Sequence, residues 1–330
     1  MIVWLSSYPR SGNTYLRTLI KICFGYDTYS IYNDNDIAGD VELSSLTGHC
    51  SLAHDIWSSE FDLGPLRQSK RIHFLKTHEP TRSLVDSADK VIYIVRDGRE
   101  ATVSYQRYQK DFNDKEASLL DLLLGLTFPH TSWAEHVAVW DPQNHCDTLL
   151  IQFENLIHRP EHAIDRIAAI ADIPIAKHAL PSFKELRQIN PKFFRSGKTD
   201  SYMNVLTEDE RLVFGLFSLR ELVQFGYTQN FPKPLIEDVY DVFRPVGTWW
   251  RENAPLLRSE LREGASENAQ RLADARKAVA GKALLADQLT EKLSRADQKL
   301  ADAEKALARM ERSWSWSLTK PLRAAHRLFW

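Results

Sequence analysis

The chain has 330 residues, a net charge of −2 at pH 7 and 43% hydrophobic residues, with a pI near 6.6. This length can form one large domain or two modest ones with an ample core. The near-neutral charge argues against a nucleic-acid-binding protein, because such proteins carry a strongly basic surface. No window of 18 or more apolar residues occurs, so we expect no membrane-spanning helix.

Three cysteines, Cys23, Cys50 and Cys146, show no metal-ligand spacing. Their odd number favours a reducing compartment in which the thiols are small core residues. Met1 leads directly into the first expected strand, which leaves no room for a signal peptide. We therefore expect a cytoplasmic protein.

The first 24 residues have the order strand, short polar loop, helix. Residues 2–5 are apolar and rich in strand-forming types, residues 6–12 are turn-forming, and apolar positions recur at helical spacing from Asn13 onwards. This order directs backbone N–H groups and the positive end of a helix dipole at an anion. The loop therefore predicts a phosphate or sulfate site.

Side chains in this loop favour the same interpretation. Arg10 adds a fixed cation, and Ser11 and Thr14 add hydroxyl donors. The loop lacks the G-x-x-x-x-G-K-[ST] pattern of nucleotide hydrolases, because no Lys follows Gly12. The alternative interpretation is an ordinary strand-to-helix turn with a surface Arg.

Residues 25–70 have mixed composition, and we expect loops and short helices around the mouth of a site, with a turn at Gly64-Pro65. Residues 71–80 follow as a buried strand that ends near Lys76 and His78. Open α/β sheets bind ligands at the carboxyl ends of their strands. A neutral His in that place can accept a proton from a hydroxyl group, although a lone His is more often structural.

Residues 91–95 form a continuous apolar run, which is typical of a strand covered on both faces. Arg96 follows the strand, and Ser104 lies on the next expected helix. Together they could hold a second phosphate, because the planar guanidinium makes bidentate contacts with a fixed charge. The alternative is a strand–turn–helix unit with Asp97 as an ordinary cap.

These segments resemble a known family. The loop SYPRSGNTYLR, the strand end FLKTHEP and the unit KVIYIVRDGREATVSY are similar, in order and spacing, to the signature segments of sulfotransferases that use 3′-phosphoadenosine 5′-phosphosulfate. The segments SFKELR and FFRSGKTDSY, within residues 182–202, agree with that family's adenine contacts and its Arg-x-Gly loop. The resemblance covers about residues 1–230.

The resemblance implies a role for each matching residue. The catalytic group would be His78 as the base, with the cations Arg10 and Lys76 near the reacting oxygens. The 5′-phosphate would be held by Ser11, Gly12, Asn13 and Thr14, and the adenine by Tyr15, Ser182 and Phe183. The 3′-phosphate would be held by Arg96, Ser104, Arg195 and Gly197. No metal is implied.

The sequence departs from the family pattern at four positions. Arg10 replaces the more usual Lys, which keeps the charge but not the ability to give up a proton. Asn13 replaces a common Thr, and Ser196 stands where a Lys is frequent, so the family's Lys contact with the 3′-phosphate is not implied here. Phe153 stands where many members have a Tyr, so a hydrogen bond is lost there.

Residues 111–148 contain an expected apolar helix, residues 119–126, and the pair Trp133 and Trp140, whose spacing of seven indicates one helix face in the core. We assign this region and residues 25–70 to acceptor binding. A further strand is expected at 148–151, and amphipathic helices at 161–173 and 207–223. The second helix begins with the capping box Thr207 and Glu210.

The composition changes after residue 250. From Leu272 to Trp314 an apolar residue recurs every seven positions, and no proline occurs from 256 to 320. This pattern predicts a coiled coil over residues 256–312 that forms a homo-oligomer, or else a long solitary helix. Alanines and Lys282 in the seam favour weak association.

Residues 313–330 are aromatic and basic, which suits a helix that lies in an anionic membrane interface. The alternative is packing against a partner chain. The segment also resembles a C-terminal sequence of bacterial enzymes of surface-glycan assembly. That likeness implies a carbohydrate or glycolipid acceptor at the inner membrane.

We therefore expect a three-layer α/β sulfotransferase fold with a central parallel sheet over residues 1–250, followed by the coiled coil and the tail. The expected reaction is transfer of a sulfuryl group from 3′-phosphoadenosine 5′-phosphosulfate to an acceptor hydroxyl, of a glycan first and a phenol or small alcohol second. A nucleotide-dependent kinase on the same fold and a non-enzymatic coiled-coil scaffold are the alternatives.

Overall fold

The structure is a computed structural model. It describes residues 1–31, 37, 39–51, 63–113, 118–125, 131–177, 180–181, 183–191, 194 and 201–228, with 252–253 and scattered positions between 291 and 309. The chain divides into two compact units, Met1–Arg258 and Ser259–Trp330. The β-sheet and the candidate site both belong to the first unit.

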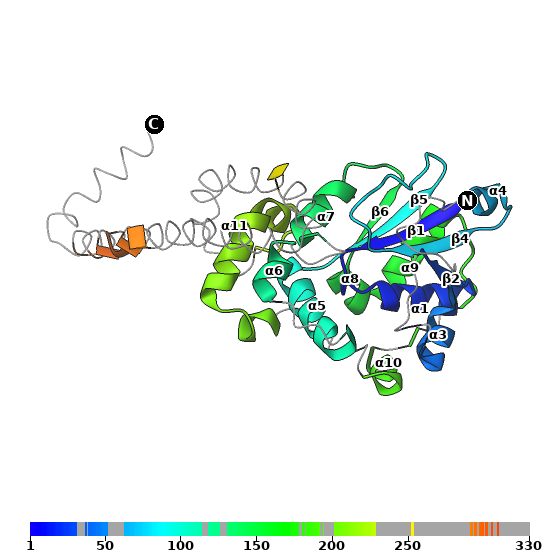
Figure 1. Cartoon of the computed structure of the whole chain (residues 1–330), viewed down its shortest axis with the longest axis horizontal. Helices are drawn as coiled ribbons and strands as arrows, with labels where there is room; N and C mark the ends of the chain where they lie inside the picture. Colours follow the sequence, from blue (N-terminus) through cyan, green and yellow to red (C-terminus); the bar gives the residue numbers. More distant parts are fainter. Residues whose placement is uncertain are drawn as a thin grey trace, which may run out of the picture. The chain divides into compact units, whose positions relative to one another are not determined.

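A parallel sheet forms the centre of the first unit (Figure 1). Its strands are β1 (Ile2–Ser7), β2 (Thr28–Ser30), β3 (His49–Ser51), β4 (His73–Thr77), β5 (Lys90–Val95) and β6 (Thr148–Gln152), in the order β3-β2-β4-β1-β5-β6. Ser6 pairs with Thr77 of β4, and Ser7 pairs with Ile94 of β5. The carboxyl ends of these three strands therefore meet at one edge of the sheet.

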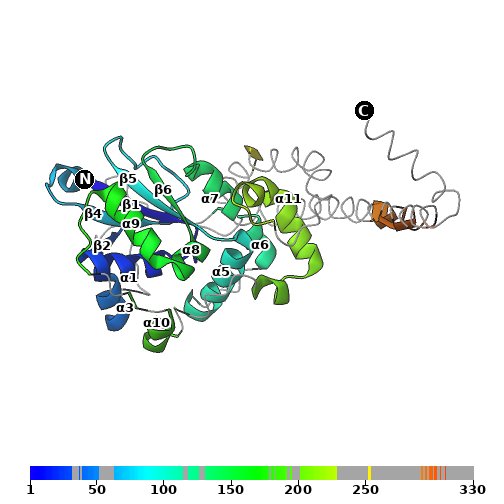
Figure 2. The same cartoon turned by 180° about the vertical axis from the view of Figure 1, so that it is seen from behind.

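Helices cover both faces of the sheet (Figure 2). One face packs against α1 (Asn13–Phe24), α3 (Val41–Thr47), α8 (Phe153–His158) and α9 (Pro160–Ala171); the other packs against α5 (Gly98–Asn113), α6 (Leu119–Leu123), α7 (Trp133–Trp140) and α11 (Glu208–Gln224). The strand period of two divides the core, since Val3 and Leu5 join the α1 face while Ile2 and Trp4 join the α5 face. Short helices α4 (Gly64–Gln68), α10 (Phe183–Ile189) and η1 (Ser201–Asn204) complete the described elements.

The predicted α/β class and parallel sheet are confirmed. Strands β1, β4, β5 and β6 lie where the apolar runs placed them. Trp133 and Trp140 are both buried at 1% exposure on α7, as their spacing indicated. Thr207 and Glu210 form the predicted capping box of α11.

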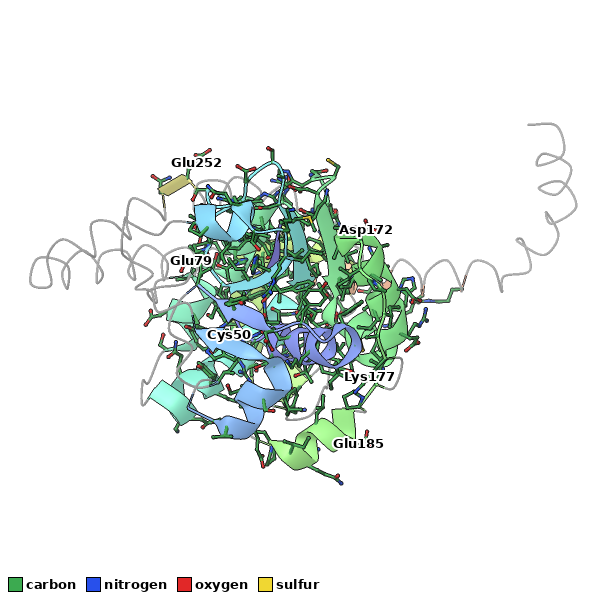
Figure 3. The ribbon with its side chains drawn as sticks, turned by 90° about the vertical axis from the view of Figure 1, so that its right-hand side faces the viewer. Cys50, Glu79, Asp172, Lys177, Glu185 and Glu252 are labelled. Atoms are coloured by element: carbon green, nitrogen blue, oxygen red, sulfur yellow. The ribbon has the colours of Figure 1, made fainter. Side chains whose placement is uncertain are left out.

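Three expectations were wrong. Residues 25–70 contain the expected short helices, α3 and α4, but also two short strands, β2 and β3, which were not expected. Gly64-Pro65 begins helix α4, with the proline in its first turn, because proline lacks only an N–H that has no partner there. The thiols are not all core residues: Cys23 is buried, but Cys50 is half-buried and Cys146 is exposed. Cys50 is labelled in Figure 3.

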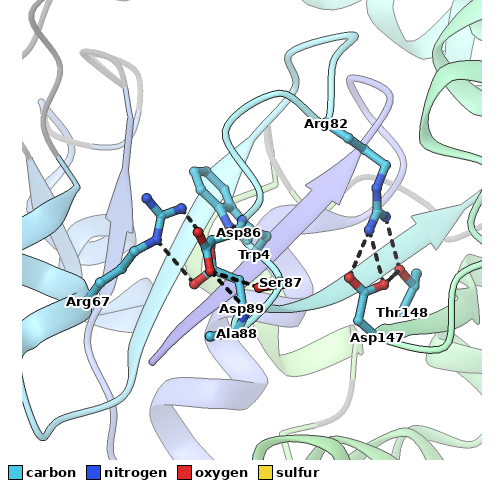
Figure 4. A network of polar contacts seen from close by, with 9 residues as sticks. All are labelled: Trp4, Arg67, Arg82, Asp86, Ser87, Ala88, Asp89, Asp147 and Thr148. Carbon is cyan, nitrogen blue, oxygen red and sulfur yellow. Dashed lines mark hydrogen bonds and ion pairs between the residues drawn. The ribbon is translucent and has the colours of Figure 1, made fainter.

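Two ion pairs fix the connection between β4 and β5 (Figure 4). Asp89 accepts hydrogen bonds from the indole of Trp4 at 3.0 Å and from Nη2 of Arg67 at 2.8 Å. Arg82 donates to both carboxylate oxygens of Asp147 at 3.0 Å. The connection that carries His78 at its start is thereby tied to β1 and to the start of β6.

In the second unit the described positions between 291 and 309 are helical. Arg295 pairs with Glu291 one turn earlier, which is an ordinary exposed helix contact. The predicted seam residues Leu293, Leu300 and Leu307 lie outside the described residues, as does the tail at 313–330. No helix among the described residues is long and apolar enough to cross a membrane.

Candidate active site

The loop between β1 and α1 has a backbone that few residue types adopt. Arg10 has φ 64° and Gly12 has φ 104°, and the left-handed region is unfavourable for a residue with a Cβ atom. Asn13, the first residue of α1, donates from Nδ2 to the carbonyl oxygen of Leu5 at 2.9 Å. This bond ties the start of the helix back to the strand and closes the loop.

The loop has the features of an anion site. Helix α1 is 12 residues long and has no acidic residue in its first turn, and its N-cap residue, Gly12, has no side chain that could cap it. The first N–H groups of the helix are therefore not satisfied by the helix itself. The hydroxyl of Ser11 is fully buried and has no hydrogen-bond partner among the described residues. A buried donor of this kind is unfavourable unless a ligand satisfies it. These residues therefore fit a phosphate or sulfate group.

Phe153, the first residue of α8, packs between the loop and Arg96. A Cβ atom built on Gly12 would lie 2.5 Å from Cδ2 of Phe153, so only glycine fits there. The guanidinium carbon of Arg96 lies 4.4 Å from the centre of the same ring, a cation–π contact. The sequence suggested only a lost hydroxyl at this position, whereas the structure gives the ring a packing role.

Arg96, immediately after β5, is directed toward the loop. Its Nη1 donates to the carbonyl oxygen of Arg10 at 3.0 Å, and its Nη2 donates to Oε2 of Glu100 at 3.3 Å. Arg96 is only 8% exposed; burial lowers its pKa, and the nearby carboxylates of Glu100 and Glu154 oppose that shift. An arginine keeps its charge under such a shift, so a fixed cation lies beside the anion site.

His78 follows β4 and contacts the end of β1. Its Nδ1 lies 2.7 Å from the carbonyl oxygen of Ser7 and 3.3 Å from the Ser7 hydroxyl. A carbonyl oxygen can only accept, so Nδ1 carries the proton, and the lone pair of the neutral ring belongs to Nε2. This is the tautomer that a general base needs.

Other predicted residues of the site have these positions. Lys76 is 6% exposed on β4, in register with Leu5 of β1. The guanidinium carbon of Arg10 lies 4.9 Å from the ring centre of Tyr108 on α5. Ser104 is half-buried on α5, and Thr14 is half-buried in the first turn of α1.

Tyr15 lies in the core rather than at an open surface. It is 4% exposed and packs with the α1 face of the sheet, where burial raises its pKa to about 12. Phe183 begins α10, but its side chain is outside the described residues, as are Ser182, Arg195 and Gly197. Their predicted contacts with the adenine and the 3′-phosphate stay predictions.

Two acidic residues at the site were missed by sequence reasoning. Glu100 is 2% exposed and contacts Arg96, and its spacing of four from Arg96 was the available signal. Glu154 accepts a hydrogen bond from the Tyr227 hydroxyl at 2.8 Å; burial raises its pKa, against the effects of that bond and of Arg96. No local pattern could have paired residues 73 positions apart.

Glu79, which is labelled in Figure 3, directly follows the candidate base His78 in the chain. Burial raises the pKa of its carboxyl group. Its backbone carbonyl accepts from the indole of Trp140 at 2.8 Å, which fixes the chain just beyond His78 against α7. Among the described residues no group of three or more His, Cys, Asp or Glu side chains could hold a metal ion.

Comparison with known proteins gives the family. The family profile described as "Sulfotransferase domain" matches residues 2–222, which include the loop, His78, Arg96 and α11 almost to its end. The chain belongs to the sulfotransferase family. The predicted resemblance is thus confirmed, and it covers the whole described sheet.

Curated relatives of the chain include two mammalian sulfotransferases. The chain is 23% identical over 199 residues to sulfotransferase 1A1 of Canis lupus familiaris, and 25% identical over 186 residues to sulfotransferase 1B1 of Mus musculus. The matches cover 56% and 53% of this chain and 65% and 60% of those relatives. The chain therefore spans less than two thirds of the length of these relatives.

Solved structures with a similar fold include two complexes with PAP. Mouse sulfotransferase SULT7A1 aligns at 18% identity and a TM-score of 0.46, over 74% of this chain and 88% of its own. Retinol dehydratase in a complex with retinol and PAP aligns at 17% identity and a TM-score of 0.47, over 67% and 81%.

Proposed function

We propose that this sulfotransferase-family chain transfers a sulfuryl group from 3′-phosphoadenosine 5′-phosphosulfate to an acceptor hydroxyl. The observation that carries the proposal is the meeting of three groups at the carboxyl edge of the sheet: the loop with the buried Ser11 hydroxyl, the cation Arg96 and the Nδ1-protonated ring of His78. An anion site beside a neutral base is what transfer of an anionic group to a hydroxyl requires.

The donor would be held by residues from separate parts of the chain. The N-terminus of α1 with Ser11, Gly12, Asn13 and Thr14 would bind the 5′-phosphate, and Arg96, Ser104, Arg195 and Gly197 the 3′-phosphate. Ser182 and Phe183 would contact the adenine, whereas Tyr15, which lies in the core at 4% exposure, is not proposed as a contact. When bound, the donor supplies the sulfuryl group together with a phosphate leaving group.

The chain's own residues position and move a proton. Nε2 of His78 accepts the proton of the acceptor hydroxyl, while the Ser7 carbonyl keeps the ring in the correct tautomer. Such a base contributes roughly 10²–10⁴-fold to the rate. Arg10 and Lys76 stabilise negative charge on the peripheral and leaving oxygens, so that fixed cations do most of the remaining work.

The acceptor is proposed to be a carbohydrate or glycolipid, bound by residues 25–70 and 111–148. Support comes from the likeness of the tail to enzymes of surface-glycan assembly. A phenol or other small alcohol is the alternative. Sulfate transfer to a panel of both acceptor classes distinguishes them.

We also propose that the enzyme is cytoplasmic and that residues 1–250 form its catalytic domain. The coiled coil at 256–312 would form a homo-oligomer, and the basic aromatic tail at 313–330 would contact the inner membrane. Sedimentation of the full chain tests whether it forms a homo-oligomer, and flotation with anionic vesicles tests whether it contacts a membrane.

Calorimetric titration with 3′-phosphoadenosine 5′-phosphate tests the function most directly, with ATP–Mg²⁺ as the control. Micromolar binding of the bisphosphate without metal is the expected result. Binding of ATP–Mg²⁺ instead would assign the chain to kinases. Binding of neither ligand would favour the alternative of a non-enzymatic coiled-coil scaffold.

A further inference from the structure

The side chain of Arg10 extends from the anion loop to helix α5. Its guanidinium carbon lies 4.9 Å from the ring centre of Tyr108, which is within the range of a cation–π contact. Two residues earlier in the same loop, the ring of Tyr8 meets the ring of Tyr105 edge-on, with 6.3 Å between the ring centres. The loop thus contacts two residues three positions apart on α5, and such residues share one face of a helix.

The ring of Tyr108 is supported from behind by more deeply buried groups. It lies nearly parallel to the ring of Tyr105, with 6.3 Å between the ring centres and 19° between the planes. Tyr105 is 3% exposed, and its hydroxyl accepts a hydrogen bond from Nε2 of Gln109 one turn later. Tyr108 itself is half-buried. Its ring is therefore held in place by the packing of α5 against the loop.

The backbone of Arg10 is also held in an uncommon conformation. Its φ of 64° lies in the left-handed region, which a residue with a Cβ atom keeps only where the surrounding contacts enforce it. One such contact is the hydrogen bond from Nη1 of Arg96 to the Arg10 carbonyl oxygen at 3.0 Å. The contact of the guanidinium with Tyr108 is a second. Arg10 is thus fixed at both its backbone and its side chain.

A guanidinium can stack on a ring and bind an anion at the same time. Its planar face contacts the aromatic ring, whereas its N–H donors lie in the plane and point outward. The ammonium of a lysine is a compact charge on a flexible stem and has no such face. Tyr108 therefore gives a physical reason for an Arg at position 10, where the family more usually has a Lys.

We propose that Tyr108 is a positioning residue for Arg10: its ring holds the guanidinium beside the anion loop, so that the contribution of this cation to binding the sulfuryl donor depends on Tyr108. This inference rests on the proposed function, which places Arg10 near the reacting oxygens. Tyr108 acts through Arg10, and its own contact is with the guanidinium.

A double-mutant cycle measures the coupling between the two residues. Calorimetry on the full chain gives the dissociation constant for 3′-phosphoadenosine 5′-phosphosulfate in the unaltered chain, Tyr108→Leu, Arg10→Gln and the double variant. We expect Tyr108→Leu to weaken binding about three- to thirtyfold, the range of a cation–π contact. In the Arg10→Gln background the same change should alter the constant by less than about twofold, because no cation remains to be positioned.

Two further variants serve as controls. Tyr108→Phe keeps the ring and should bind the donor within about twofold of the unaltered chain. Arg82→Gln is the matched control for the cation: the guanidinium carbon of Arg82 lies 5.6 Å from the ring centre of Trp140, and Arg82 binds Asp147 outside the site. Its substitution should lower the unfolding temperature without changing the affinity for the donor.

The outcomes separate the inference from the proposed function. If the unaltered chain binds the donor and a folded Tyr108→Leu variant binds it as tightly or more tightly, the inference is overturned and the proposed function stands. An equal loss in both Arg10 backgrounds, or an equal loss in Tyr108→Phe, would overturn it as well, because Tyr108 would then act by packing or through its hydroxyl.

A second variant covers the case in which Tyr108→Leu does not fold. Tyr108→Met, which is closer to tyrosine in length, then takes its place in the cycle, with the same expected and contrary results. An unaltered chain that does not bind the donor would overturn the proposed function itself, and this inference with it.

Discussion

Nδ1 of His78 lies 2.7 Å from the carbonyl oxygen of Ser7, at the ends of the neighbouring strands β4 and β1. This contact joins the side chain of the residue that follows β4 to the backbone at the end of β1, where the anion loop begins. It also fixes which ring nitrogen can accept a proton. The candidate base is therefore oriented by the sheet itself.

Substitution of this residue should separate chemistry from binding. His78→Ala is expected to abolish turnover while leaving affinity for 3′-phosphoadenosine 5′-phosphate near that of the unaltered chain, because the base contacts the acceptor and not the nucleotide. The exposed His145 provides a control, since His145→Ala should change neither quantity. A large loss of nucleotide affinity in His78→Ala would mean that His78 is more than the base.

Removal of the Arg96 side chain should selectively weaken the binding of nucleotides that carry a 3′-phosphate. Arg96→Ala is expected to reduce the affinity for 3′-phosphoadenosine 5′-phosphate by about 1.5–3 kcal/mol, the scale of a charge-assisted hydrogen bond. Affinity for adenosine 5′-phosphosulfate, which has no 3′-phosphate, should scarcely change. Calorimetry of both ligands measures the difference, and equal losses would contradict the 3′-phosphate assignment.

Two glycines with positive φ allow the cost of backbone strain to be separated from the cost of a steric clash of an added Cβ atom. Gly25 has φ 76° and nothing within 4 Å of an added Cβ, whereas Gly12 has φ 104° and the ring of Phe153 at 2.5 Å. Gly25→Ala should therefore cost only the left-handed backbone penalty, about 1–2 kcal/mol in the free energy of unfolding. Gly12→Ala should cost more and also weaken nucleotide binding, because the loop must move.

Urea unfolding and calorimetry measure the two effects. Equal stability losses in the two variants, with full nucleotide affinity in Gly12→Ala, would show that the loop accommodates a methyl group. The contact between Gly12 and Phe153 would then have no role in shaping the site.

The buried contacts of Asp89 (Figure 4) should make the free energy of unfolding depend on pH. Burial raises its pKa, but hydrogen bonds from Arg67 and Trp4 outweigh that effect, so the net pKa lies below the usual 3.8. A carboxyl group with a lowered folded pKa stabilises the fold above its unfolded pKa, and this stabilisation is lost as pH falls through the folded value. Asp89→Asn should therefore destabilise the chain by about 1.5–3 kcal/mol at pH 7.

The deficit of Asp89→Asn relative to the unaltered chain should shrink on acidification below the unfolded pKa of 3.8. Asp147→Asn is the comparison at the second ion pair, where both side chains are more exposed, at 15% and 23%. Its cost at pH 7 should be smaller, because water screens the pair. Urea unfolding at several pH values measures both variants, and a pH-independent deficit for Asp89→Asn would contradict this account.

Local pattern predicted the long elements well. Strands β1, β4 and β5 are apolar runs, α1, α9 and α11 have helical periodicity, and α11 begins with a capping box, so their residues alone specify them. Strands β2 and β3 were missed because each has three residues, too few for a period to appear. They form because β4 provides an edge with which β2 pairs, and Thr28 there bonds to Arg17 and Thr47.

The sequence by itself determined the α/β class, the family and the residue types of the anion loop, because each depends on neighbouring residues along the chain. Only the tertiary structure decided that the ring of Phe153 lies between Gly12 and Arg96. It alone decided that the Ser7 carbonyl selects the tautomer of His78 and that Glu100 joins Arg96 to Ser201. These contacts unite residues from different strands and helices. Apart from the spacing of four between Arg96 and Glu100, no sequence spacing encodes them, since they exist only once the parallel sheet has brought its strand ends together.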